Sequence, residues 1–373
     1  MFRKIKNAFI NVIIISISVC ILFIFLEIFL RFMPIVNSVN WVPITQEDKI
    51  LRHSENSEIT YSKDWNFKYS NTRRVNNYGF LNDQNYTSNP STSLIAVIGD
   101  SYVEAMLNKY ENTFYGKLEK HLSGNSLVYS FGVSGAQLSQ YIAWIDYTNK
   151  EFNPELFIIP IIANDFDESF YKYKRTRGFH YFNEHSLDGT IYSINRVDSK
   201  FRRILLSSSL FRYVFFHLRA GDLLKKTKNI IVKKYNNDKT EARYIGNVVA
   251  EVSSQHEFDG MIATDLFFKK LEKIIKPNQK VIFILDAVRP SIYSPQSLID
   301  SENSFWSKMR VYFSNHESMK NFTLIDMQDY FIKHYNDNEL KFEYKTDGHW
   351  NDLAHSLVFK NLINHKYIYK YIK

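Results

Sequence analysis

The stretch "AVIGDSYVEA", residues 96–105, poses the central question of this fold. It overlaps the apolar run Leu94–Ile98, which is typical of a buried strand, and Tyr102–Met106 is expected to begin a helix. Gly-Asp-Ser lies between them at residues 99–101, and all three residue types favour turns. A serine at such a bend is either a turn residue or a nucleophile whose hydroxyl lies near the positive end of a helix. The tripeptide alone leaves both interpretations open.

Outward from this bend, short apolar runs alternate with amphipathic segments. Because strands that alternate with helices form parallel sheets covered on both faces, the pattern predicts an α/β fold. We expect a three-layer, doubly wound, flavodoxin-like sheet of about five mostly parallel strands. The expected strands are 94–98, 127–131, 156–162, 281–285 and 322–325, and the expected helices are 110–122, 137–149, 265–275, 305–313 and 351–362.

Two parts of the chain lack this alternation. Residues 34–90 are polar, and we expect them to form a juxtamembrane connector that packs on the main domain, residues 91–370. Inside that domain, residues 166–260 are rich in Tyr, Arg, Lys and Asn, with a predicted hairpin around Asp188-Gly189. This stretch is too long for a connection within a compact fold, so we predict an insertion able to cover a site.

The N-terminus has the pattern of a membrane anchor. A basic stub, residues 1–7, precedes the apolar run Ala8–Leu26, which would span about 28 Å as a helix. The predicted anchor is residues 8–33, with a lipid bilayer as partner, the stub in the cytoplasm and the rest of the chain outside. A cleaved signal peptide is the alternative. The run is long for one, and Val-Asn-Ser at residues 36–38 is a poor cleavage site.

Composition narrows the function classes. The 373 residues are 45% hydrophobic and 23% charged, which is typical of a folded protein. The net charge of +8 is accompanied by no zinc-ligand spacing and no RNA-binding motif, so nucleic acid is not an expected partner. Cys20 is the sole cysteine, which excludes an intramolecular disulfide and a cysteine-based metal site.

Three further motifs lie where predicted strands end. Gly-Val-Ser-Gly at residues 132–135 follows the second strand, and Ala-Asn-Asp at residues 163–165 follows the third. Near the C-terminus, "TDGHWND" contains Asp347 and His349. Acyl transfer needs a hydroxyl nucleophile, a base, a carboxylate that orients the base, and hydrogen-bond donors for the oxyanion. These motifs together with Gly-Asp-Ser contain that set.

In this order the four motifs resemble the SGNH hydrolases, or GDSL esterase superfamily, over roughly residues 92–165 and 278–365. Ala163 stands where the family usually has glycine. The resemblance implies that no metal or organic cofactor is needed. It also implies catalytic Ser101, Asp347 and His349, and an oxyanion hole formed by Ser101, Gly135 and Asn164.

The last motif departs from the commonest family pattern, because only Gly348 separates Asp347 from His349. That shorter form resembles the branch acting on acetyl groups of bacterial exopolysaccharides. The resemblance therefore implies a membrane-anchored serine esterase that removes O-acyl groups, with O-acetyl expected, from an extracytoplasmic carbohydrate. An O-acetyltransferase with the same triad is the alternative, and a non-catalytic polysaccharide-binding or assembly protein is a second alternative.

A competing Asp-x-x-His pair occurs at Asp352 and His355. It falls inside the expected last helix, where an acidic residue favours the positive helix end for structural reasons alone. We therefore favour Asp347 and His349 as the acid–base pair.

Overall fold

The described part of the chain forms two units in this computed structural model. It comprises residues 2–37, 41–122, 124–186, 188–220, 244–245, 248–249, 251–294 and 301–372. The anchor unit consists of Met1–Asn40, Ile59–Thr72 and Asp198–Asp238, and the sheet unit of Trp41–Glu58, Arg73–Val197 and Lys239–Lys373. Each unit is described separately below.

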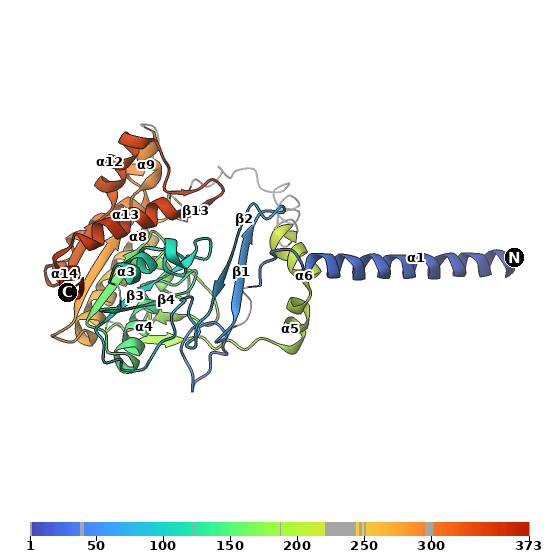
Figure 1. Cartoon of the computed structure of the whole chain (residues 1–373), viewed down its shortest axis with the longest axis horizontal. Coiled ribbons are helices and arrows are strands. Elements are labelled where there is room, and N and C mark those ends of the chain that lie inside the picture. Colours follow the sequence, from blue (N-terminus) through green and yellow to red (C-terminus); the bar gives the residue numbers. More distant parts are fainter. Residues whose placement is uncertain are drawn as a thin grey trace. The chain divides into compact units, whose positions relative to one another are not determined.

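The sheet unit is built on five parallel strands in the order β11-β10-β5-β3-β4 (Figure 1). The predicted α/β fold with a doubly wound parallel sheet is therefore confirmed. The strands are β3 (Leu94–Gly99), β4 (Leu127–Gly132), β5 (Leu156–Ile161), β10 (Lys280–Leu285) and β11 (Thr323–Asp326).

Alternate residues of each strand pack on opposite faces of the sheet. Ile95 and Val97 of β3 belong to one buried cluster, which also contains side chains of α3 and α13. Ala96 and Ile98 belong to a second cluster with side chains of α4, α8 and α11. Both faces are thus covered, as a parallel sheet of continuous apolar strands requires. The covering helices are α3 (Phe114–Leu122), α13 (Asp352–Ile363), α4 (Leu138–Glu151), α8 (Ser254–Ile274) and α11 (Phe305–Asn315).

Shorter elements connect these layers. The hairpin β6–β7 confirms the turn predicted around Asp188-Gly189, and a second hairpin, β12–β13, precedes α13. These elements are α2 (Ser101–Glu104), η1 (Tyr110–Asn112), η2 (Asp167–Ser169), β6 (His180–Phe182), β7 (Ile191–Ser193), β8 (Tyr244–Ile245), β9 (Val248–Val249), α9 (Arg289–Tyr293), η4 (Glu317–Asn321), α12 (Gln328–Asn338), β12 (Glu343–Tyr344), β13 (Asp347–Trp350) and α14 (Lys366–Ile372).

Two helices differ from the sequence-based expectation. Helix α8 begins at Ser254, so regular alternation resumes inside the stretch predicted as an insertion. Helix α12 lies between β11 and the β12–β13 hairpin and was not predicted. Phe331 is its one buried residue, so the helix lacks the wide apolar stripe that periodicity detects.

The connector residues contribute to the core of the sheet unit. Leu51, Phe80 and Tyr86 are buried in the cluster that also contains β3 and β4 residues. The Arg73 guanidinium is buried and donates to the carbonyl oxygens of Ala105 and Asn108, each at 3.1 Å. These contacts place connector residues directly behind α2.

The anchor unit contains α1 (Phe2–Leu30), which is long and apolar enough over Ile5–Leu30 to cross a membrane, with a mean hydropathy of 3.0. A signal sequence also meets this description. The unit's other elements are β1 (Glu58–Lys63), β2 (Tyr69–Arg74), α5 (Lys200–Ser207), α6 (Ser209–Arg212) and the π-helical turn η3 (Tyr213–His217).

Two glycines let α2 approach the sheet. Gly99 and Gly132 are neighbours in the register of β3 and β4, at the carboxyl end of each strand. A Cβ on Gly99 would lie 2.4 Å from Cγ2 of Val103, and one on Gly132 would lie 2.8 Å from the backbone N of Glu104. Helix α2 therefore rests on bare backbone, and the residue that begins it, Ser101, sits at the edge of the sheet.

Replacing Gly132 tests this packing. Gly132→Ala should lower the free energy of unfolding by about 1–3 kcal/mol, because the backbone of α2 must move to admit the methyl group. Gly124→Ala is the control: its φ is +83° and open space surrounds its Cβ position, so only backbone strain of about 1 kcal/mol is expected. Denaturant unfolding measures both, and a smaller loss in Gly132→Ala than in Gly124→Ala would refute the packing constraint.

Candidate active site

Ser101 is the first residue of α2 and follows β3 directly. The Asp100 carboxylate caps the helix by accepting from the backbone N–H of Tyr102 at 2.9 Å. The Ser101 hydroxyl donates to the other oxygen of Asp100 at 3.2 Å. Because Ser101 opens the helix, no carbonyl of α2 is available to its backbone N–H. The hydroxyl and this N–H therefore lie at the same end of the sheet.

Asp347 and His349 lie on β13, in a hairpin after α12 instead of at the end of a sheet strand. Asp347 is buried, and its Oδ1 accepts from the backbone N–H of His349 at 3.0 Å. Nδ1 of the same imidazole makes a second, short hydrogen bond to this oxygen. Nε2 of His349 has no hydrogen-bond partner among the described residues. The pair therefore has the arrangement of an imidazole oriented by a carboxylate, with its second nitrogen left without a protein partner among the described residues.

Tyr102 brings this pair next to Ser101. Its hydroxyl donates to the carbonyl oxygen of Gly348 at 3.1 Å, and its ring lies 5.3 Å from the imidazole of His349. Within the described residues no hydrogen bond joins Ser101 to His349. Catalytic hydrogen bonds are often long in ligand-free structures and tighten when substrate binds.

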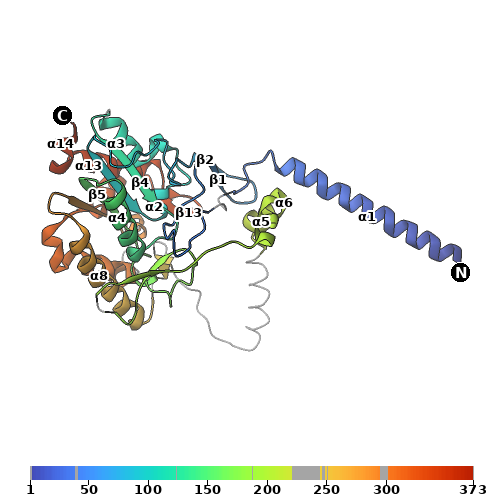
Figure 2. The ribbon, with the colours of Figure 1, turned by 90° about the horizontal axis from the view of Figure 1, so that it is seen from below.

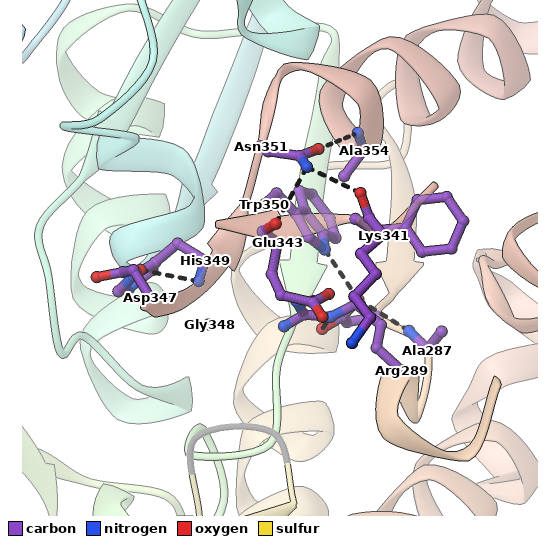
Figure 3. A network of polar contacts seen from close by, with 12 residues as sticks. Ala287, Arg289, Lys341, Glu343, Asp347, Gly348, His349, Trp350, Asn351 and Ala354 are labelled. Atoms are coloured by element: carbon purple, nitrogen blue, oxygen red, sulfur yellow. Dashed lines mark hydrogen bonds and ion pairs between the residues drawn. The ribbon is translucent and has the colours of Figure 1, made fainter. Parts of the chain in front are cut away.

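A polar network centred on the buried Arg289 guanidinium joins the β12–β13 hairpin to the chain after β10 (Figure 3), and Arg289 also reaches Tyr102. Asp286, the residue after β10, accepts from Nε1 of Trp350 at 2.8 Å and from Nε of Arg289 at 3.2 Å. The Arg289 guanidinium donates to the Tyr102 hydroxyl at 2.6 Å and to Glu343 at 3.2 Å. Sequence reasoning missed Asp286, Arg289 and Glu343, although Asp286 was detectable as a carboxylate that directly follows a predicted strand.

The proposed oxyanion residues follow β4 and β5. Gly135 has a φ of +84° in the turn after β4, and its N–H makes no hydrogen bond within the described chain. Asn164 follows β5 and is buried, and its side-chain oxygen also has no partner among the described residues. This oxygen is a hydrogen-bond acceptor, so the oxyanion role proposed for Asn164 would use the side-chain NH2 group, which is the donor.

Glu104 links the turn after β4 to the connector. Both residues of the pair Glu104–His53 are buried, with 2.6 Å between Oε1 and Nε2. The other oxygen of Glu104 accepts from the backbone N–H of Ser134 at 2.7 Å and from the Ser134 hydroxyl. This carboxylate, which falls in the first turn of a helix, therefore positions the residue before Gly135. His53 is invisible to motif analysis because it lies far away in sequence.

Lys174, from the predicted insertion, is a further residue that sequence reasoning missed. Its Nζ donates to the carbonyl oxygen of Gly135 at 2.6 Å and pairs with Glu168. Through Lys174, the insertion contacts the same turn after β4 that Glu104 contacts.

A hollow of about 550 Å³ lies on β12 and β13. It is lined by Asp347, Gly348 and four other residues of the hairpin region.

Asp100 and Asp165 are two fully buried carboxylates that lie next to Ser101 and Asn164 in the chain. Asp165 accepts from the Tyr141 hydroxyl and from the backbone N–H of Ile162, each at 2.8 Å. Burial raises the pKa of Asp165 well above its usual range, and the Asp100 charge raises it further. Burial also raises the pKa of Asp100 to about 6, against the lowering effects of the Tyr102 N–H and the nearby His349.

The competing pair, Asp352 and His355, does not come together. Asp352 accepts from the side-chain amides of Asn108 and Asn112 at 2.8 and 2.7 Å. Nδ1 of His355 instead accepts from the backbone N–H of Phe114 at 3.3 Å. Burial lowers the pKa of His355 to about 3, so this imidazole is a neutral core group.

No protein-family model matches this chain, and a comparison with curated protein sequences finds no match. Solved structures similar to it include the lipase Lip_vut3 from a goat rumen metagenome, at 12% identity and a TM-score of 0.38, covering 73% of this chain and 96% of the lipase. A lipolytic protein of the G-D-S-L family from Veillonella parvula has 11% identity and a TM-score of 0.36, with 74% and 99% covered. An aryl esterase from M. smegmatis has 10% identity and a TM-score of 0.37, with 73% and 96% covered.

These solved structures are lipases and esterases, the class that the four sequence motifs resemble. At TM-scores this low, the similarities carry no argument about activity. The role of the site is therefore argued from its own geometry.

Asp100 predicts a pH dependence of stability. Its pKa of about 6 lies above its usual value of 3.8, so the folded chain binds this proton more tightly than the unfolded chain. The stabilisation is complete below about pH 4 and is lost as pH rises through about 6. The shift corresponds to about 3 kcal/mol at most. Asp100→Asn should therefore gain stability relative to wild type between pH 4 and 7, measured by denaturant unfolding at each pH. A difference that stays constant with pH would contradict the prediction.

Proposed function

We propose that this protein is a serine esterase of the SGNH type, with Ser101 as nucleophile, His349 as general base and Asp347 as the carboxylate that orients the imidazole. One observation carries the proposal. The hairpin β12–β13 lies against α2 through the 3.1 Å hydrogen bond from Tyr102 to Gly348, so the Asp347–His349 pair adjoins the helix that Ser101 begins.

In the first half-reaction Ser101 Oγ attacks the ester carbonyl carbon while Nε2 of His349 takes the hydroxyl proton. The tetrahedral intermediate collapses as its bond to the alcohol oxygen breaks, and His349 returns the proton to that alcohol. Asp347, bonded to Nδ1, stabilises the imidazolium that forms in between. The hydroxyl must first leave Asp100, its partner in the free enzyme.

In the second half-reaction His349 takes a proton from water, and the hydroxide oxygen attacks the acyl-serine. Collapse breaks the bond to Ser101 Oγ, which takes the proton back from His349, and releases the carboxylic acid. The N–H groups of Ser101 and Gly135 and the Asn164 amide stabilise the oxyanion in both halves. In the transferase alternative, a sugar hydroxyl replaces water in this half-reaction, with the same proton transfers.

The substrate we propose is an O-acetyl or other O-acyl carbohydrate outside the cytoplasm. The support is the resemblance of the Asp-Gly-His-Trp motif to polysaccharide-modifying SGNH proteins, together with the basic residues that precede the apolar run Ala8–Leu26 and favour a cytoplasmic N-terminus. On this proposal α1 is an uncleaved single-pass anchor.

The nucleophile is tested with p-nitrophenyl acetate and a fluorophosphonate probe. Wild type should hydrolyse the ester and be labelled, and Ser101→Ala should do neither. Asn164→Ala should retain labelling, with kcat/KM lower by about 10²–10³ because one oxyanion donor is lost. Wild-type turnover in Ser101→Ala would refute the nucleophile. If wild type shows neither reaction, an acetyl donor with a surface oligosaccharide distinguishes the transferase, which acetylates the sugar, from the binding protein, which does not.

The two histidines provide a matched test of the base. His349→Ala should lower kcat by at least about 10³-fold, because the nucleophile loses its proton acceptor. His355→Asn should keep kcat per folded molecule close to that of wild type and lower the free energy of unfolding by about 1–3 kcal/mol. Ester hydrolysis and denaturant unfolding of both purified variants measure these effects. The reverse pattern would move the base into α13.

A further inference from the structure

The anchor unit exposes an unusual number of large apolar side chains beyond α1 itself. Phe201 and Ile204 on α5 are 69% and 68% exposed. Val214, Phe215 and Leu218, on and just after η3, are also exposed. We call these five side chains the juxta-anchor surface. Five large apolar side chains exposed within residues 201–218 indicate that this segment has an apolar partner.

The segment that carries this surface is bonded to the end of α1 by the Glu27 carboxylate, each oxygen of which accepts two hydrogen bonds. Glu27 lies one turn before the C-terminus of α1 and accepts from the backbone N–H groups of Ser209 and Leu210 at 3.1 and 2.9 Å. It also accepts from the Ser208 hydroxyl at 2.8 Å and from Arg31 at 3.0 Å. The start of α6 is therefore held against α1, and α5, which ends one residue before, is held near it.

A buried histidine holds the other end of the segment. Nδ1 of His217 lies 3.0 Å from the carbonyl oxygen of Asp64, to which it donates, while Nε2 accepts from the backbone N–H of Val36 at 3.2 Å. Burial lowers the pKa of His217, which favours the neutral form that this pair of bonds requires. Thus η3 is bonded to the chain just after α1.

The two attachments flank α5 on its C-terminal side, and the ribbon of Figure 1 shows how α5 lies relative to α1. In Figure 1 α5 runs across the direction of α1, near the C-terminal end of α1, and Figure 2 shows α5 and α6 beside the same end. A helix that crosses a membrane span where the span ends lies in the plane of the headgroups. Phe201 and Ile204 share one face of α5 by their spacing, and Arg203 lies on the other.

We propose that α5 and η3 rest in the headgroup region of the bilayer that α1 spans, with Phe201, Ile204 and Phe215 inserted among the acyl chains. An amphipathic helix with apolar side chains on one face and cations on the other binds a lipid surface in this way, to a depth of about 5–10 Å. Lys200, Arg202, Arg203 and Arg212 supply cations for anionic headgroups. The proposal rests on the proposed anchoring by α1.

The test uses the full chain in vesicles of phosphatidylcholine and phosphatidylglycerol, with an environment-sensitive fluorophore on a single cysteine. In a Cys20→Ser background, the cysteine is placed by Phe201→Cys, by Ile204→Cys or, as control, by Arg203→Cys. All three positions are exposed, so folding is preserved. We expect quencher-bearing lipids to remove most of the emission at positions 201 and 204 and little at position 203.

Two outcomes overturn the proposal. Equal quenching at all three positions would show that no face of α5 is selected by lipid. Emission at position 201 protected from both lipid quencher and aqueous iodide would show that protein covers this surface. A label on the native Cys20, exposed in the middle of α1, distinguishes these results from failure of the anchor, because lipid quenchers reach it only if α1 is inserted.

Discussion

The close approach of α2 to the carboxyl ends of β3 and β4 is the constraint on which the site depends. Gly99 and Gly132 face each other in the register of the two strands, and any Cβ at either position would collide with α2. That approach places the positive end of a short helix, with Ser101 as its first residue, at the edge of the sheet. The turns after β4 and β5 end at the same edge, so Gly135 and Asn164 lie there as well.

Buried charges then connect this edge to the rest of the sheet unit. Arg289 is buried and shared by Asp286, Glu343 and the Tyr102 hydroxyl. A buried ion pair adds little net stability, since the Coulomb attraction must first offset desolvation, but removing one partner is strongly destabilising. The Arg289 network has a clear effect on geometry. It holds α2, α9 and the β12–β13 hairpin in one arrangement, and that hairpin carries the Asp347–His349 pair.

The sheet strands and most of the candidate site residues could be predicted from the sequence, because each depends on a pattern within a short segment. The strand Leu94–Ile98 was recognisable from its continuous apolar run, and Ser101, Gly135 and Asn164 from their places after such runs. Helix α12 escaped prediction because one buried residue makes no periodic pattern. Glu104 is bonded to His53, which is 51 positions away in the sequence. Contacts at that separation have no signature in local spacing.

By itself, the sequence determined the alternation of strands and helices, the apolar N-terminal helix and the residue types available for acyl transfer, because periodicity, length and side-chain chemistry are properties of short segments. The sequence favoured Asp347 and His349 over Asp352 and His355, but only the tertiary structure shows which Asp and His are hydrogen bonded to each other. Asp347 and His349 meet across one residue of an extended strand, where alternate side chains share a face. Asp352 and His355 are separated by the packing of α13, which directs one toward η1 and the other into the core.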